Sequence, residues 1–159
     1  MPNRVGLGLD AHAFEKGRRL VIGGIEVPHD RGLAGHSDAD VLVHALMDAL
    51  LGACGERDIG ANFPDTDPAY KDISSIVLLE EVIGRLREKG FRVVNTDCVV
   101  IAQEPHLSPY IDLMRDLLAA TMRVDADRVG VKATTTEGLG FTGRGEGIAA
   151  IATVLIETI

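Results

Sequence analysis

The apolar run at residues 147–157 constrains the fold most strongly. It is hydrophobic at almost every position, as is typical of a strand that is buried on both faces. The run is far shorter than the roughly 20 residues that span a bilayer, so it indicates a strand and not a membrane segment. With 159 residues, the chain is long enough to bury about two-thirds of its unfolded surface without a disulfide or a metal. We therefore expect one domain over residues 1–159.

Hydrophobic spacing predicts the other elements. Residues 4–12 alternate like a strand, with Val5, Leu7 and Leu9 on one face and glycines on the other. A helix is expected to begin at Ser37, because the sequence that starts there resembles a capping box. The helices span 37–54, 73–89 and 107–123, two strands span 91–102 and 128–134, and residues 19–27 form a strand or a tight hairpin. The fold class is α+β, a single-domain sheet with helices packed on one side.

The charge balance limits the partners of the chain. The formal net charge is −8, from 16 basic and 24 acidic residues, which argues against binding to nucleic acid or to an anionic membrane. An anionic substrate would need localised positive charge, most simply a metal ion. The two cysteines, Cys54 and Cys98, lie in apolar stretches and exclude a disulfide scaffold. No signal peptide is apparent, so we expect a cytoplasmic protein.

Three residues form a candidate metal site. Asp10 and His12 are two apart on a strand and point to the same side, and His44 lies two turns into the first helix. Asp40 and Asp48 flank His44 by one turn each and are expected to orient its imidazole. Alone, each feature is more simply an ion pair or a half-buried histidine. Together, one aspartate and two histidines with an open fourth position are typical of a catalytic zinc site, although iron and manganese stay open.

Two loops are candidates for substrate binding. Residues 58–68 are rich in acids and prolines and are either a turn assembly or a loop that binds sugar hydroxyls. Residues 132–147 combine closely spaced glycines with the run of three threonines at 134–136, Glu137 and Arg144. Backbone N–H groups, hydroxyls and a guanidinium suit phosphate, and a carboxylate suits magnesium. A bulged hairpin is the simpler interpretation, but it does not require this mixture of side chains.

Six segments together resemble the 2-C-methyl-D-erythritol 2,4-cyclodiphosphate synthase family. The resemblance covers essentially the whole chain, and the last segment is highly specific. The segments are G-x-D-x-H at 8–12, HSDADVLVH at 36–44, DIG at 58–60, FPDTDP at 63–68, AQEP at 102–105 and KATTTEGLGFTGRGEG at 132–147.

The resemblance implies a reaction and an assembly. In 4-diphosphocytidyl-2-C-methyl-D-erythritol 2-phosphate, the 2-phosphate attacks the β-phosphorus, CMP leaves, and a cyclic diphosphate of the non-mevalonate isoprenoid pathway forms. The resemblance also implies a phosphorus–oxygen lyase that assembles as a homotrimer with active sites between subunits. No covalent intermediate on the protein is required.

The resemblance further implies a role for individual residues. Asp10, His12 and His44 match the zinc ligands, and Glu137 matches the ligand of a second ion, Mg²⁺ or Mn²⁺, on the diphosphate. His36 and Thr135 match transition-state stabilisers. The positions around the erythritol are matched by Asp58, Gly60, Phe63 and Asp65. The cytidine-phosphate pocket is matched by Ala102, Pro105 and Thr134–Thr136. The positions near the phosphates and the trimer axis are matched by Phe141 and Arg144. The full set of implied substrate-binding residues is Asp10, His12, His36, Ser37, Asp58, Ile59, Gly60, Phe63, Pro64, Asp65, Ala102, Pro105, Thr134, Thr135, Thr136, Glu137, Phe141 and Arg144.

Two departures and two competing hypotheses remain. Leu7 stands where many members of the family have a polar residue, and the Glu104–His106 stretch also varies. One competing hypothesis is a metal-dependent phosphohydrolase that uses the same Asp10, His12 and His44 site to activate water. The other is a non-catalytic binding module that holds zinc structurally, against which the open coordination position argues.

Overall fold

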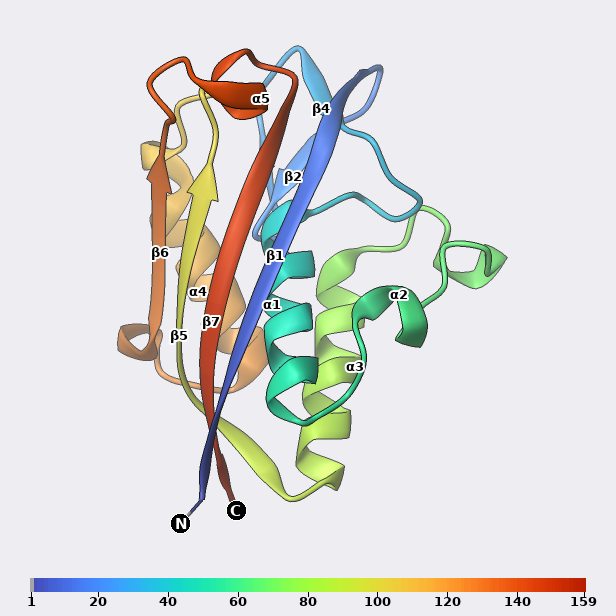
Figure 1. Cartoon of the computed structure of the whole chain (residues 1–159), viewed down its shortest axis with the longest axis vertical. Helices are drawn as coiled ribbons and strands as arrows, with labels where there is room; N and C mark the ends of the chain where they lie inside the picture. The colour runs from blue at the N-terminus through green and yellow to red at the C-terminus, as the bar shows by residue number, and fades with distance from the viewer. Residues whose placement is uncertain (1) are drawn as a thin grey trace.

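A computed structural model describes residues 2–159 as one sheet covered by helices (Figure 1). The five strands of this sheet run in the order β4-β1-β7-β5-β6, and only β5 and β6 are parallel neighbours. In Figure 1 the long helices lie behind the sheet or to its right and none of them crosses in front of it, so the α+β class with helices on one side is confirmed. The main strands are β1 (Asn3–Lys16), β4 (Arg31–Leu33), β5 (Phe91–Ile101), β6 (Val129–Thr134) and β7 (Gly147–Thr158), and β2 (Leu20–Ile22) pairs with β3 (Ile25–Val27) as a separate hairpin.

Three long helices form the second layer. Helix α1 packs against β1 and β7, and α4 makes the crossover between the parallel strands β5 and β6. The long helices are α1 (Val41–Ala53), α3 (Ser75–Glu88) and α4 (Ile111–Met122). Short helices α2 (Ile59–Asn62) and α5 (Gly140–Gly143) lie within the two loops that were expected to bind substrate, and single 3-10 turns occur at Pro68–Tyr70, Ser108–Tyr110 and Ala126–Arg128.

The glycine face of β1 is the face that packs on α1. A Cβ at Gly6 would lie 1.8 Å from the carbonyl oxygen of Ala49, and one at Gly8 would lie 1.9 Å from that of Ala45. Only glycine therefore allows the strand to approach the helix backbone so closely. The large apolar side chains of β1 point the other way, and Leu7 is 68% exposed.

Two predicted elements need correction. Helix α1 begins at Val41 with Asp40 as its N-cap, instead of beginning at Ser37, because Ala39 has a φ of 56° that cannot continue a helix. Strand β1 runs to Lys16, so Asp10 and His12 lie inside it and not at its end.

The last strand is also less covered than its composition predicted. Alternate residues of β7 from Ile148 to Ile156 are fully or almost fully buried against the helices. On the opposite face Thr153 is exposed, and Ile151 and Leu155 are half-buried. Within residues 2–159, this face of the sheet has no second layer (Figure 1).

Candidate active site

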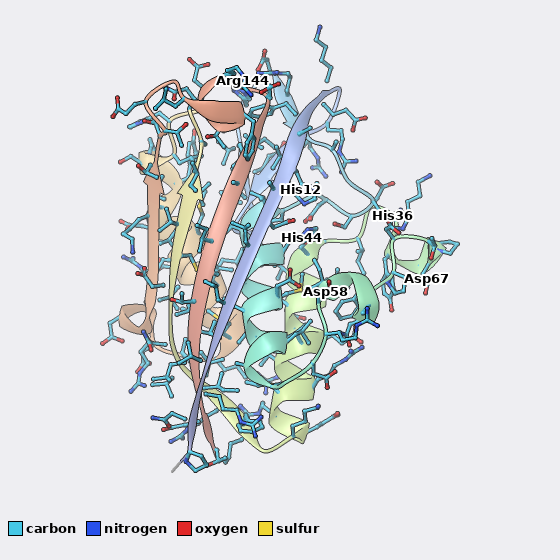
Figure 2. The ribbon with its side chains drawn as sticks, in the orientation of Figure 1. His12, His36, His44, Asp58, Asp67 and Arg144 are labelled. Carbon is cyan, nitrogen blue, oxygen red and sulfur yellow. The ribbon has the colours of Figure 1, made fainter. Side chains whose placement is uncertain are left out.

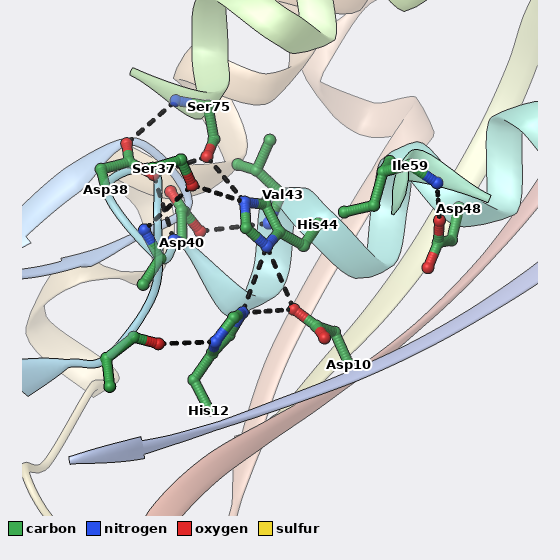
Figure 3. Close-up of polar contacts among 12 residues, drawn as sticks. Asp10, His12, Ser37, Asp38, Asp40, Val43, His44, Asp48, Ile59 and Ser75 are labelled. Carbon is green, nitrogen blue, oxygen red and sulfur yellow. Dashed lines mark hydrogen bonds and ion pairs between the residues drawn. The ribbon is translucent and has the colours of Figure 1, made fainter. Parts of the chain in front are cut away.

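Asp10, His12 and His44 form a compact cluster between β1 and α1 (Figures 2 and 3). Asp10 Oδ2 lies 2.7 Å from His12 Nε2 and 3.2 Å from His44 Nδ1, and the two ring nitrogens are 3.2 Å apart. Ligands of one tetrahedral zinc ion, each bound at about 2.0–2.1 Å, lie roughly 3.3 Å from one another. The predicted candidate ligands are therefore brought together, and their separations suit one small cation.

The hydrogen bonds around the cluster leave lone pairs facing its centre. His12 Nδ1 lies 2.8 Å from the carbonyl oxygen of Ala34, which can only accept a hydrogen bond, so Nδ1 carries the hydrogen and the neutral ring has its lone pair on Nε2. Asp10 Oδ2 is buried, and no hydrogen bond of good geometry reaches it. Buried polar atoms normally have a partner, so an orphaned carboxylate oxygen facing two imidazole nitrogens fits a bound metal ion.

The electrostatics of Asp10 and His12 also fit a metal ion bound between these side chains. Burial opposes ionisation of Asp10, but the interactions of the carboxylate with the adjacent His12 and His44 imidazoles outweigh it and lower the pKa of the carboxyl to about 2. Burial likewise opposes a charge on His12, yet the Asp10 carboxylate raises the pKa of this imidazole above its usual value.

The partners of His44 differ from those expected. His44 Nε2 lies 3.1 Å from Ser37 Oγ and 3.0 Å from Ser75 Oγ, and neither Asp40 nor Asp48 is hydrogen-bonded to the ring. The carboxylate of Asp48 accepts from the backbone N–H of Ile59 instead. The prediction that the two aspartates orient His44 is wrong, because spacing on a helix does not show which backbone donors compete for a carboxylate.

Asp40 instead fixes the start of α1. Its fully buried carboxylate accepts from the N–H groups of Val43, Gly23 and Gly24, and so joins the helix to the β2–β3 turn. Burial and the nearby charge of Asp38 raise the pKa of Asp40 to about 6, although these three N–H groups act in the opposite direction. The residue is a helix cap that secures the frame around His44.

A cavity of about 310 Å³ opens beside the cluster. We refer to it as the histidine cavity. His36 lies at its rim, and His36 Nε2 is 3.0 Å from the carbonyl oxygen of Asp67. Asp58 caps α2 through the N–H of Ala61 and is not part of the lining. The lining residues are His12, Gly35, His36, Ser37, His44, Ile59, Gly60, Phe63, Asp65, Tyr70 and Leu78.

A second cavity of about 660 Å³ lies at the ends of β5 and β6 and shares no lining residue with the first. We refer to it as the threonine cavity. It brings together four of the predicted substrate residues, Ala102, Pro105, Thr134 and Thr135. Its other lining residues are His29, Gln103, Glu104, His106, Leu107, Ser108, Ile111 and Ala133.

The glycine-rich loop beyond Thr135 is exposed. Glu137 adopts a φ of 55°, and its N–H donates to Thr135 Oγ1 over 3.2 Å. The hydroxyl of Thr136 donates to the carbonyl oxygen of Leu139. The guanidinium of Arg144 is paired with Glu146 at 2.8 Å. Thr136, Glu137, Arg144 and Phe141, which is 45% exposed, line neither of the two cavities.

Sequence reasoning missed several residues that shape the cavities. Arg18 donates to the carbonyl oxygens of Gly35 and Ser37, each over 2.6 Å, and thereby holds the segment that carries His36. His29 lines the threonine cavity from the loop between β3 and β4. Neither residue belongs to a motif that spacing alone could have identified.

The chain is similar to known proteins over almost its whole length. The model of the YgbB family matches residues 3–157. The chain belongs to the YgbB family. Two curated relatives named 2-C-methyl-D-erythritol 2,4-cyclodiphosphate synthase, from Syntrophomonas wolfei and Bacillus subtilis, are 58% and 57% identical to it over 154 residues. The alignments cover 97% of this chain and 98% of each relative.

Solved structures of the family show the same fold. A structure of 2C-methyl-D-erythritol-2,4-cyclodiphosphate synthase described as a bound form with CDP matches with a TM-score of 0.89 at 38% identity, and 97% of this chain and all of that chain are covered. The bifunctional IspDF from Campylobacter jejuni matches with a TM-score of 0.95 at 42% identity. The match covers 99% of this chain but only 43% of the bifunctional protein.

Among the helices of the described residues, none combines the length and hydrophobicity that crossing a membrane requires.

Proposed function

We propose that this chain converts 4-diphosphocytidyl-2-C-methyl-D-erythritol 2-phosphate into 2-C-methyl-D-erythritol 2,4-cyclodiphosphate and CMP, as a phosphorus–oxygen lyase of isoprenoid biosynthesis. The observation that carries the proposal is the cluster of Asp10, His12 and His44 beside the histidine cavity, in a chain 58% identical to a synthase of that name. Two free cysteines, Cys54 and Cys98, agree with a cytoplasmic location.

The cluster suits zinc best among the metals considered. Two imidazoles and one carboxylate are three protein ligands, which leaves the open position that a catalytic zinc site needs. Glu137 offers a hard oxygen ligand for a second ion, Mg²⁺ or Mn²⁺. When bound, such ions stabilise charge on the diphosphate as Lewis acids.

The chain's own residues bend the substrate and hold its charges. An oxygen of the 2-phosphate bonds to the β-phosphorus, the bond from that phosphorus to CMP breaks, and CMP leaves with the electron pair. Because nucleophile and electrophile belong to one molecule, holding the bent shape supplies much of the rate enhancement. His36 and Thr135 donate hydrogen bonds to the oxygens on which charge builds up.

The substrate would use both cavities. We assign the erythritol to the histidine cavity, with Asp58, Ile59, Gly60, Phe63, Pro64 and Asp65 around it. We assign the cytidine phosphate to the threonine cavity, whose backbone and hydroxyl groups suit a nucleotide. A structural relative from Plasmodium falciparum is described as a CDP complex, with a TM-score of 0.85 at 28% identity.

A homotrimer with active sites between subunits would unite the two cavities. The open face of the sheet supports this proposal, because Val5, Leu7 and Leu9 are 72%, 68% and 65% exposed on one stripe of β1. A stripe of this kind is typical of a surface that another chain covers. In this position Leu7 would contribute apolar area to the interface, where many members of the family have a polar side chain.

Phosphorus NMR tests the function directly. Incubation of the zinc- and magnesium-loaded protein with the diphosphocytidyl substrate should release CMP and a cyclic diphosphate, and a chelator should stop both. Linear phosphate that carries oxygen from labelled water would instead support a metal-dependent phosphohydrolase. Binding of substrate without any product would support a non-catalytic module.

A further inference from the structure

The far nitrogen of His44 lies between two serine hydroxyls. Nε2 is 3.0 Å from Ser75 Oγ and 3.1 Å from Ser37 Oγ, whereas Nδ1 faces Asp10 and His12, the other two candidate metal ligands (Figure 3). Ser75 has no exposed surface, and His44 is only 8% exposed. Water therefore does not decide which nitrogen of the ring carries the hydrogen, and the buried neighbours must do so.

The direction of the hydrogen bonds around Ser75 follows from Asp38. Ser75 Oγ lies 2.5 Å from Asp38 Oδ1, and an ionised carboxylate can only accept. The single hydrogen of the Ser75 hydroxyl is therefore used on Asp38. Its oxygen can then only accept from His44, which places the ring hydrogen on Nε2.

Ser37 cannot make this choice alone. Its Oγ accepts from the backbone N–H of Ala39 over 3.2 Å, and its own hydrogen has no carboxylate to hold it. The hydroxyl is thus free to donate to His44 Nε2 or to accept from it. Only Ser75 has its hydrogen committed elsewhere.

Asp38 also fixes the position of Ser75. Oδ2 of Asp38 accepts the N–H of Ser75 over 3.0 Å, and Oδ1 accepts the N–H of Asp40 over 3.1 Å. Asp38 thereby joins the start of α3 to the start of α1. The N-cap of α3, Ser74, makes no side-chain cap bond of its own, so this more distant carboxylate does the capping.

We propose that Ser75, held by Asp38, fixes the His44 imidazole in the tautomer whose Nδ1 lone pair points into the metal cluster. This inference rests on the proposed metal-dependent function. In the other tautomer a hydrogen on Nδ1 would point at Asp10 and His12 and would block coordination. Ser75 lines neither the histidine nor the threonine cavity, so it is a positioning residue and makes no contact with substrate.

The test compares Ser75→Ala with Ser74→Ala, an exposed neighbour one position earlier on the same helix start. Zinc affinity is measured by competition with a chromophoric chelator. The His44 tautomer is read from ring nitrogen chemical shifts in the metal-free protein, at mildly alkaline pH where imidazoles are neutral. For Ser75→Ala we expect zinc affinity to fall about 10–100-fold, the usual effect of losing an outer hydrogen-bond partner, and the ring to populate both tautomers. Ser74→Ala should match the wild type in both measurements.

Two results would overturn the inference. One is a Ser75→Ala protein that melts earlier but keeps the zinc affinity and the His44 tautomer of the wild type, since Ser75 would then only stabilise the fold. The other is a wild-type protein whose metal-free His44 carries its hydrogen on Nδ1, a result that needs no variant to fold. Wild-type protein that binds no zinc would contradict the proposed function instead, and the tautomer measurement would still test the geometry.

Discussion

The histidine cavity and the threonine cavity are built in opposite ways. In the first, the side chains that hold the metal come from β1 and α1, and their far nitrogens are held by the half-buried Ala34 and the buried Ser75. In the second, the working groups lie at strand ends, and Thr134 and Thr135 are exposed. The histidine cavity is therefore preorganised for its ligand, whereas the threonine cavity is open and exposed.

This difference follows from what each cavity is proposed to bind. A metal ion requires lone pairs at fixed separations, so its ligands need rigid elements and an outer layer of hydrogen bonds. A nucleotide can be held by backbone groups and hydroxyls that adjust when it binds. The open cavity also lies at the end of a sheet whose outer face has no cover in the single chain, which suits completion by a second subunit.

His12→Ala should have the largest effect, because it removes a metal ligand. We expect turnover to fall about 1000-fold or more, since a Lewis acid supplies several kcal/mol and each 1.4 kcal/mol is tenfold in rate. Zinc titration measures the loss of metal affinity, and steady-state kinetics measure the loss of turnover. The free energy of unfolding should change by only about 1 kcal/mol, the typical value of one hydrogen bond. Lys16→Ala, exposed at the end of the same strand, is the control. Zinc affinity retained in His12→Ala would remove this residue from the cluster.

Thr135→Ala tests the open cavity. We expect kcat to fall by about 100- to 1000-fold, roughly 2.7–4 kcal/mol at most, the effect of removing one donor from a developing oxyanion. Zinc affinity should stay unchanged, because Thr135 is exposed and lies outside the metal cluster. A rise in KM with unchanged kcat would mean that Thr135 binds substrate without stabilising the transition state.

Mixing the two inactive variants tests whether one active site uses both cavities from different subunits. In trimers formed at random from equal amounts, each intersubunit site draws one cavity from each neighbour. Each required cavity is intact in half of the subunits, so about a quarter of the sites should be active. Co-refolding followed by an assay of CMP release measures this recovery. Activity that stays at the level of the separate variants would place both halves of the site in one chain.

Most of the fold could be predicted from the sequence because apolar periodicity reports burial. It identified all three long helices, and for residues 19–27 the structure shows the hairpin and not the single strand that was also expected. It missed the true start of α1, because the positive φ of Ala39 is imposed by the buried contacts of Asp40 with Gly23 and Gly24. Periodicity also does not show which face of β1 is inside, since here the glycines pack and the large side chains remain outside.

The cluster of Asp10, His12 and His44 could be predicted from the sequence. Alternation along β1 places Asp10 and His12 on the same side, and helical spacing limits the direction of His44. The surroundings of the cluster were not predictable. Ser75 is 31 residues from His44 and carries no motif. The division of the substrate residues between two cavities depends on the packing of strands that are distant in sequence. Such contacts are set by tertiary structure, which local patterns do not encode.

Arg85→Ala should have the smallest effect, and it tests the substrate-contacting residues of the histidine cavity separately from the metal ligands. The Arg85 guanidinium lies 4.9 Å from the ring centroid of Phe63 and donates to Asn62 Oδ1 over 2.8 Å, so it holds the end of α2 against α3. Its loss should remove about 1–1.4 kcal/mol of positioning energy and raise KM roughly 5- to 10-fold, with kcat almost unchanged. Zinc affinity should not change, because the metal ligands stand on β1 and α1. Arg87→Ala, exposed two residues further along the same helix, is the matched control. If Arg85→Ala weakened zinc binding as much as it raised KM, the metal ligands and the substrate-contacting residues would be coupled. The proposed contrast between a rigid metal site and an adjustable substrate surface would then be wrong for this cavity.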